Sequence, residues 1–199
     1  MALVLAKNIT MTTNTDERLS DLWEGCLKND RKQQEMLYRM LAPKMLAVCM
    51  RYANDKDEAQ DILQEGFIKM FKNMRNYRGE GSLEGWIRRI MVHSAISRYR
   101  KAKTTVLVDD FAEQKIPISS SYNNNGLEAR DLMQMVDELP TTYRSVFNLY
   151  AIEGYSHLEI SSKLGMSELL SRTTLHRART ILKNKLNSLA VRERYCLAG

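Results

Sequence analysis

The stretch Ser156–Lys185 reads SHLEISSKLGMSELLSRTTLHRARTILKNK, and its spacing predicts a helix-turn-helix. Ser156-x-x-Glu159 is a capping box opening a short helix to Leu164, because the hydroxyl and the carboxylate satisfy each other's free amides. Gly165-Met166-Ser167 then makes a tight turn into a longer helix that ends near Leu189. This helix has a buried apolar stripe and a separate basic stripe: Leu175, Ala178 and Leu182 form the first, and Arg172, His176, Arg179 and Lys183 the second.

The basic stripe favours insertion of the second helix into the major groove of DNA. A solvated face of an ordinary helical hairpin is the alternative. The turn, the capping box and the basic charge occur together here, and this combination favours DNA binding over the hairpin.

The rest of the chain also predicts helices, because proline and glycine are scarce, at 3 and 9 residues, and apolar residues recur at helical spacing. Residues 102–126 lose this periodicity and collect turn-forming residues, which is typical of a linker. The expected fold is all-α: two small helical domains, 16–101 and 127–190, are joined by the extended linker 102–126, with an N-terminal extension 1–15 and a C-terminal tail 191–199. Expected helices span 16–28, 31–40, 43–52 with Pro43 in its first turn, 57–74, 82 onward, 127–138 and 141–153.

Composition narrows the functional classes. The chain has 199 residues, 44% of them hydrophobic, and a net charge of +6, which favours an anionic partner, nucleic acid before a membrane surface. Cys26, Cys49 and Cys196 are widely separated, so we expect no disulfide framework, no metal site and a reducing, cytoplasmic location. No segment is typical of a signal peptide or a membrane span. We expect no cofactor and no enzymatic activity, since the three histidines are dispersed and no glycine-rich phosphate loop is present.

Two further charged segments lie before the linker. Residues Trp86–Lys103 carry six basic side chains and no acidic one, with Trp86 and Tyr99 among them, a composition that can neutralise phosphates and stack on unpaired bases. The segment Asp55–Glu65 is acidic, and the helix dipole explains Asp57 and Glu58 better than it explains residues further along the helix. The polar edge formed by Asp61, Gln64 and Glu65 is therefore a candidate docking face for a basic partner.

Five segments, in order, resemble the extracytoplasmic-function class of bacterial sigma factors in the sigma-70 family. They are DEAQDILQEGFIK at 57–69, YRG at 77–79, WIRRI at 86–90, EGYSHLEI at 153–160 and LHRAR at 175–179. Each motif is weak by itself, whereas the ordered series is specific, and the resemblance covers residues 35–189. It implies a promoter-specificity subunit of RNA polymerase, made of a sigma domain 2 and a helix-turn-helix sigma domain 4.

The resemblance also implies residue roles. Asp61, Gln64, Glu65 and Lys69 fall where such factors bind the clamp helices of the largest polymerase subunit, and the second-largest subunit's flap is a further contact. The residues that fall in the −10 reading and melting region are Tyr77, Arg78, Gly79, Trp86, Arg88, Arg89, His93, Arg98 and Arg100. Those that fall on the −35 recognition helix are Ser171, Arg172, Thr173, His176 and Arg177. Asp109, Asp110 and Glu113 match the acidic linker segment that enters the polymerase channel.

Two positions depart from the family pattern. His93 stands where asparagine is usual, and Leu169-Leu170 replace a common Gly-Thr at the entry to the recognition helix. We interpret the two leucines as packing residues, with a shift in groove depth as the alternative. Because both departures lie in DNA-reading elements, we expect promoter choice to depend partly on another recruiting protein.

Other interpretations stay open. A conventional helix-turn-helix regulator would explain Ser156–Lys185 but not the polar edge beside a basic helix, and a membrane-surface protein using Trp86–Lys103 is more distant. The sequence leaves open the promoter consensus, the inducing signal, control by an anti-sigma factor, and whether Met1 or Met11 is the start.

Overall fold

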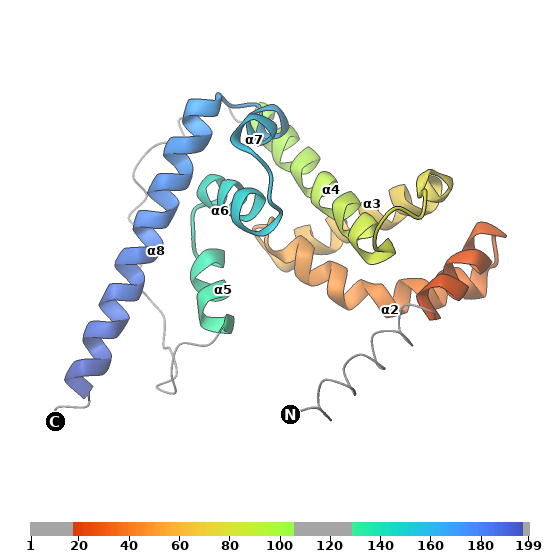
Figure 1. Cartoon of the computed structure of the whole chain (residues 1–199), viewed down its shortest axis with the longest axis horizontal. Helices are drawn as coiled ribbons and strands as arrows, with labels where there is room; N and C mark the ends of the chain where they lie inside the picture. Colours follow the sequence, from red (N-terminus) through yellow and green to blue (C-terminus); the bar gives the residue numbers. More distant parts are fainter. Residues whose placement is uncertain (1–17, 106–128, 197–199) are drawn as a thin grey trace. The chain divides into compact units, whose positions relative to one another are not determined.

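The computed structural model describes residues 18–105 and 129–196, and within these ranges the regular elements are helices without a strand (Figure 1). The predicted all-α fold is confirmed. The chain divides into two compact units, Met1–Ala95 and Ile96–Gly199, each of which is described by itself. In the described part of the chain, no helix has the length and apolar character that crossing a membrane requires.

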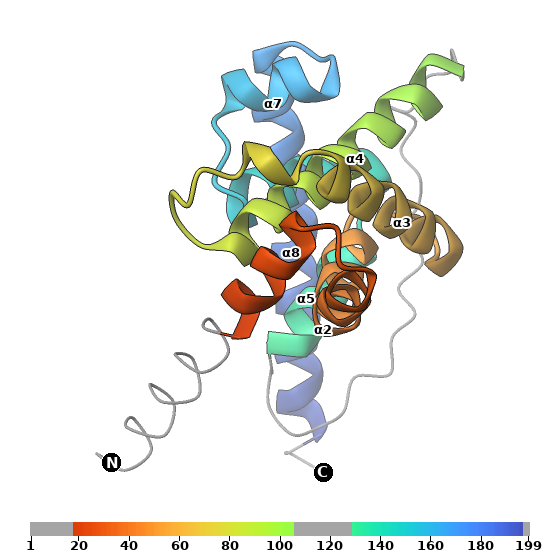
Figure 2. The same cartoon turned by 90° about the vertical axis from the view of Figure 1, so that its right-hand side faces the viewer.

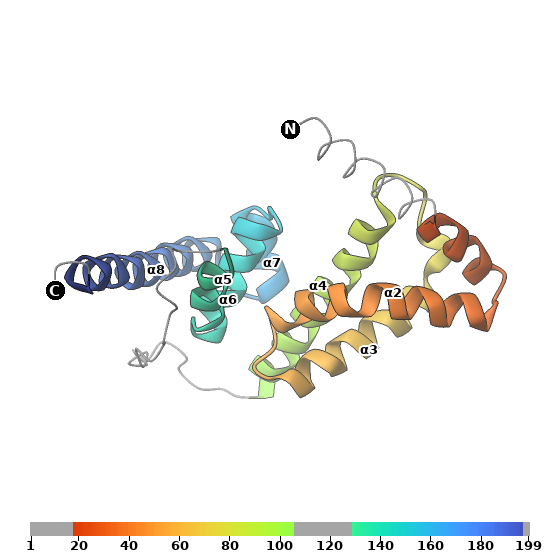
Figure 3. The same ribbon diagram turned by 90° about the horizontal axis from the view of Figure 1, so that it is seen from below.

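The N-terminal unit is built from a first helix at 18–27, then α2 (Arg31–Met50), α3 (Lys56–Lys72), the 3-10 turn η1 (Met74–Asn76) and α4 (Leu83–Thr105), which continues past the unit's end. Helices α2 and α3 run side by side and α4 crosses them (Figure 3). Aspartates begin two of these helices: Asp30 accepts from the Lys32 amide at 2.8 Å, and Asp55 accepts from the Glu58 amide at 2.7 Å. Such caps satisfy amides that have no partner inside the helix.

The predicted break before Pro43 is wrong, because α2 is one continuous helix with Pro43 inside it. Proline in a helix interior removes a hydrogen bond and costs roughly 3 kcal/mol. One stripe of α2 buries Leu37, Leu41, Met45 and Val48. Burying each such side chain gains about 1.5–3 kcal/mol, so packing outweighs the proline and keeps the two predicted helices joined.

The C-terminal unit comprises α5 (Ala129–Asp137), α6 (Thr141–Phe147), the π-helical turn η2 (Asn148–Ile152), α7 (His157–Leu164) and α8 (Glu168–Cys196). Helices α5, α6 and α7 all contact α8 (Figure 1). Val136, Leu139 and Ala178 form a buried cluster, covered by Tyr143, Phe147, Ile181 and Leu182. Helix α8 therefore supplies both part of this core and the second helix of the helix-turn-helix.

Two other boundaries differ from the expected ones. The helix expected at 141–153 widens into a π turn, in which the Glu153 amide donates to the Asn148 carbonyl at 3.0 Å. Helix α8 runs to Cys196 instead of ending near Leu189, and α4 runs to Thr105, so residues 102–105 of the expected linker are helical. The rest of the linker, with Asp109, Asp110 and Glu113, lies outside the described residues. The predicted domain limits stay a prediction.

Candidate nucleic-acid and docking interfaces

The helix-turn-helix forms with the predicted capping box. The Ser156 hydroxyl accepts from the Glu159 amide at 3.3 Å, and the Glu159 carboxylate accepts from the Ser156 amide at 2.8 Å. The bond from the Ser156 amide, together with one that the Ser156 hydroxyl donates to the same carboxylate oxygen at 2.8 Å, stabilises the charged carboxylate and lowers the pKa of Glu159. Gly165 follows α7 with φ of +63°, a left-handed conformation that glycine adopts without strain. Figure 2 shows α7 at one end of α8, where this turn joins the two helices.

The start of α8 presents one face to solvent and buries the other. The predicted DNA-contacting residues Arg172, Thr173, His176 and Arg177 are all exposed. Ser171, which was grouped with them, is fully buried, and its hydroxyl is 3.0 Å from Nδ1 of His157. Its prediction as a DNA-contacting residue is therefore corrected: in this structure Ser171 holds α8 against α7.

Two exposed residues of this face already have partners on α8. The Arg172 guanidinium donates to one Glu168 oxygen through Nε at 3.2 Å and through a terminal nitrogen at 2.5 Å. The Thr173 hydroxyl lies 3.1 Å from the Leu169 carbonyl oxygen and 3.0 Å from that of Leu170. Arg172 is thus held beside a carboxylate, and Thr173 directs its proton into the helix.

His157 lies in an aromatic and cationic environment on α7. Its ring stacks on Tyr150 with centroids 4.6 Å apart, and the Arg179 guanidinium is 5.5 Å from the Tyr150 ring centroid. Burial, with Arg172 close by, lowers the pKa of His157 below its usual 6.5. A neutral imidazole is therefore favoured, and it orients the recognition helix through Ser171.

In the N-terminal unit, an aromatic cluster supports the loop after η1. Tyr77 donates its hydroxyl proton to the Gly81 carbonyl at 2.7 Å, which closes a short loop whose Gly79 and Gly81 have φ of +75° and +80°. Trp23 packs edge-on against both Tyr77 and Trp86, with centroids 5.7 Å away in each pair. Motif analysis missed Trp23 as a support of this loop, because it lies outside every motif, on the first helix.

The DNA-contacting residues predicted on α4 differ in exposure. Arg89, His93 and Arg100 are exposed, whereas Trp86, Arg88 and Arg98 are half-buried. Ser82 begins this helix as predicted, its hydroxyl accepting from the Gly85 amide at 3.2 Å. The helix therefore offers cations to solvent while its apolar residues, among them Ile87 and Met91, fill the core.

The polar edge of α3 is exposed at Asp61 and Gln64 and half-buried at Glu65 and Lys69. The Lys69 ammonium forms an ion pair with Glu65 at 2.7 Å and donates to the buried Ser94 hydroxyl at 3.2 Å. Lys69 thus links α3 to α4, so its substitution would disturb the fold as well as any contact that it makes.

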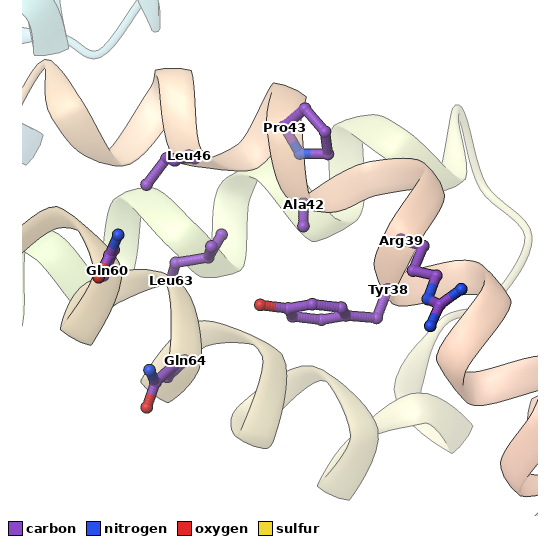
Figure 4. Close-up of a pocket in the computed structure, with 8 residues that line it drawn as sticks. All are labelled: Tyr38, Arg39, Ala42, Pro43, Leu46, Gln60, Leu63 and Gln64. Carbon is purple, nitrogen blue, oxygen red and sulfur yellow. The ribbon is translucent and has the colours of Figure 1, made fainter.

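A groove of about 510 Å³ lies beside this edge, between α2 and α3. Figure 4 shows its lining: Tyr38, Arg39, Ala42, Pro43, Leu46, Gln60, Leu63 and Gln64. Sequence reasoning missed the α2 side because the expected break at Pro43 divided these residues between two helices. The merged helix places Tyr38, Ala42 and Leu46 at successive turns of one face.

Comparison with known proteins assigns both units. The model of sigma-70 region 2 matches residues 37–105, and that of sigma-70 region 4 matches residues 129–182. The chain belongs to the sigma-70 family, in its extracytoplasmic-function class. The region 2 match contains the polar edge of α3 and all of α4, and the region 4 match contains α7, the turn after it and the first half of α8. The helix at 18–27 precedes both matches.

Curated relatives support the assignment of this sigma factor. It is 31% identical over 157 residues to the ECF RNA polymerase sigma factor SigE of Mycolicibacterium smegmatis, covering 75% of this chain and 60% of that protein. It is 26% identical over 187 residues to the RNA polymerase sigma-H factor of Pseudomonas aeruginosa, covering 88% of this chain and 97% of the relative. Among solved structures it is similar to the sigma factor RpoE from Bartonella quintana in complex with the anti-sigma factor NepR, with TM-score 0.45 and 19% identity over 77% of this chain and 96% of that one.

Proposed function

We propose that this sigma factor binds core RNA polymerase, recognises a −35 duplex and opens the −10 element, and so directs promoter-specific transcription initiation. The observation that carries the proposal is the ordered pair of matches, region 2 at 37–105 and region 4 at 129–182, each over helices with an exposed charged face. A conventional helix-turn-helix regulator would account for the second match only. The proposed role is that of a non-catalytic initiation factor acting with polymerase.

The polar edge of α3 is the proposed contact with the clamp helices of the largest polymerase subunit. Asp61 and Gln64 are exposed there, and Glu65 and Lys69 form a half-buried pair beside them. The exposed Asp61 carboxylate adds negative charge to this edge, which suits a basic partner surface. The flap of the second-largest subunit is the proposed partner of the C-terminal unit.

The loop at Tyr77–Gly81 and helix α4 are the proposed −10 reading and melting elements. Positive φ angles at both loop glycines and the Tyr77 hydroxyl bond hold the loop open to solvent around the exposed Arg78. Unstacking a base costs a few kcal/mol, which contacts in a preformed loop can offset. Four basic side chains of α4 are exposed or half-buried and would contact the DNA phosphates: Arg88, Arg89, Arg98 and Arg100. His93, on the same helix, is proposed to lie in this interface with them.

The exposed face of α8 is the proposed −35 reader, with Arg172, Thr173, His176 and Arg177 toward the major groove. Buried Ser171 supports the helix. Asp109, Asp110 and Glu113 keep their proposed place in the polymerase channel, which rests on the sequence resemblance alone.

Gel filtration with core polymerase tests the docking face. Wild-type protein should co-elute with core, and Asp61→Lys should abolish co-elution because it places a cation against a basic surface. Asp21→Lys is the matched control, since Asp21 is equally an exposed acid on the first helix, outside the region 2 match. Core binding by Asp61→Lys at wild-type strength would contradict the assignment.

Transcription from a mapped promoter tests the DNA face. Arg172→Ala and Arg177→Ala should each weaken −35-dependent initiation, by about 1–3 kcal/mol where the arginine contacts a base through two bonds. Wild-type initiation by both variants would remove these residues from the −35 interface. Sequence-selective initiation by core and this factor alone would show that no recruiting protein is required.

A further inference from the structure

Leu169 is an apolar side chain displayed on the charged face of the recognition helix. It is 72% exposed, so the expectation that it is a packing residue is wrong, whereas Leu170 beside it is half-buried. Ser167 fixes its position, because the Ser167 hydroxyl accepts from the Leu170 amide at 3.1 Å and so begins α8 just before Glu168. Leu169 therefore stands in the first turn of α8, the part of a recognition helix that reaches base edges.

The neighbouring exposed residue adds a second apolar group. Thr173 follows Leu169 by four positions, so the two side chains are adjacent on one helix face. The Thr173 hydroxyl is turned toward the carbonyl oxygens of Leu169 and Leu170, at 3.1 and 3.0 Å. With its proton used there, Thr173 offers a methyl group and an acceptor oxygen outward, but no donor.

The charged groups around this apolar pair fit an anionic duplex. Arg172 lies between Leu169 and Thr173 in the sequence and is held by Glu168 at 2.5 Å. Glu168 is the only acidic residue within 163–185, a segment with six basic residues, of which Arg172, Arg177, Arg179 and Lys183 are exposed. A protein partner that covered Leu169 would have to face this cationic surface, whereas a DNA duplex complements it.

We propose that Leu169, assisted by the Thr173 methyl group, reads the 5-methyl group of a thymine in the −35 duplex. Thymine alone presents a methyl group in the major groove, and apolar side chains recognise it by contact. This inference rests on the proposed function. It makes Leu169 a specificity-determining residue and gives the departure from the usual Gly-Thr a chemical consequence.

Replacing thymine with deoxyuridine tests the contact, since it removes the methyl group and keeps every base-pairing atom. The full chain is assembled with core polymerase, and its strongest mapped promoter is prepared with each −35 thymine of either strand changed singly to deoxyuridine. Affinity and initiation are measured at one fixed salt concentration. For the wild type, one substitution should weaken binding about fourfold, the effect of one methyl-sized group returned to water.

Leu169→Ala should bind the thymine promoter about fourfold or more weakly than wild type and should lose the response to that one deoxyuridine. The matched control is Leu158→Ala, which truncates a 68% exposed leucine on α7 and should keep the full methyl response. Circular dichroism should show the same fold for all three proteins, because both leucines are exposed.

Several results would overturn the inference. A wild type that depends on its −35 element but ignores every deoxyuridine has no methyl contact. The inference also fails if the −35 element contains no A·T pair. It fails again if the Leu169→Ala variant retains the methyl response, because Leu169 is then not the residue that contacts the methyl group. Loss of core binding instead of DNA binding by Leu169→Ala would assign the residue to a protein contact. None of these results would contradict the proposed function. That function would fail on a different result, the absence of promoter-specific initiation by wild-type protein with core polymerase.

Discussion

Adding a single methyl group at Gly66 should destabilise the N-terminal unit by disturbing the packing of α3 on α4. A Cβ at this position would overlap Sδ of Met91 and lie 3.1 Å from its Cε. Met91 is fully buried, so it can yield only by repacking within the core. Alanine gains about 1 kcal/mol of helix propensity over glycine, and overpacking costs about 1–3 kcal/mol. The Gly66→Ala variant should therefore lose about 0–2 kcal/mol.

Urea unfolding followed by tryptophan fluorescence measures this unit selectively, because both tryptophans, Trp23 and Trp86, lie in it. A second variant isolates the contact. Met91→Ala by itself should cost about 2–5 kcal/mol by opening a cavity. The double variant Gly66→Ala/Met91→Ala should lose about 1 kcal/mol less stability than Met91→Ala alone, since the new methyl group at position 66 occupies part of the cavity. A stabilised Gly66→Ala protein, or strictly additive effects, would refute the close approach of these helices.

Two predictions concern charges in the C-terminal unit. Because the pKa of His157 is lower in the folded chain than the usual 6.5, the unfolded chain binds more protons as the pH falls through 6.5, so stability should decrease over that range. Circular dichroism should show a smaller decrease for His157→Gln, with no difference in tryptophan fluorescence, and equal pH profiles would contradict the prediction. Lys185→Met breaks a pair with Glu138 at 2.7 Å whose side chains are 12% and 27% exposed, and should cost about 1–2 kcal/mol in thermal unfolding. Arg39→Met, which breaks a pair 76% and 59% exposed, should cost under about 0.5 kcal/mol, and equal losses would show that burial does not matter.

Sequence patterns predicted the features that depend on residues a few positions apart, such as helix caps and buried helix faces. The Ser156 capping box and the apolar stripe of α8 are set by residues three or four positions apart; the capping box is confirmed, and the stripe is buried at Leu175 and Ala178 and partly buried at Leu182. Ser171 was misplaced although its position was informative. It stands four residues before Leu175 and seven before Ala178, in register with the buried stripe, and its polar character alone suggested a surface role.

Contacts between distant segments were beyond sequence reasoning. Nothing near Lys69 in the sequence indicates that its ammonium meets the Ser94 hydroxyl on α4, and no local rule shows that packing against α3 would keep α2 intact through Pro43. Both features have the same cause. Contacts between separate helices outweigh local propensity, and they join residues that no local pattern relates, such as Lys69 and Ser94, which lie 25 residues apart in the chain.

The net charge of +6 does not show how charged and apolar side chains are distributed along α8. Its first two turns are nearly neutral, since Glu168 pairs with Arg172, and they carry the exposed Leu169 and Thr173. The exposed cations Arg177, Arg179 and Lys183 come later in the helix. Phosphate attraction is insensitive to sequence, whereas contact with a base edge is not. In the proposed −35 complex, the charge-compensated start of α8 would therefore gain little from nonspecific DNA, and its apolar groups would be stabilised only where the groove offers a methyl group.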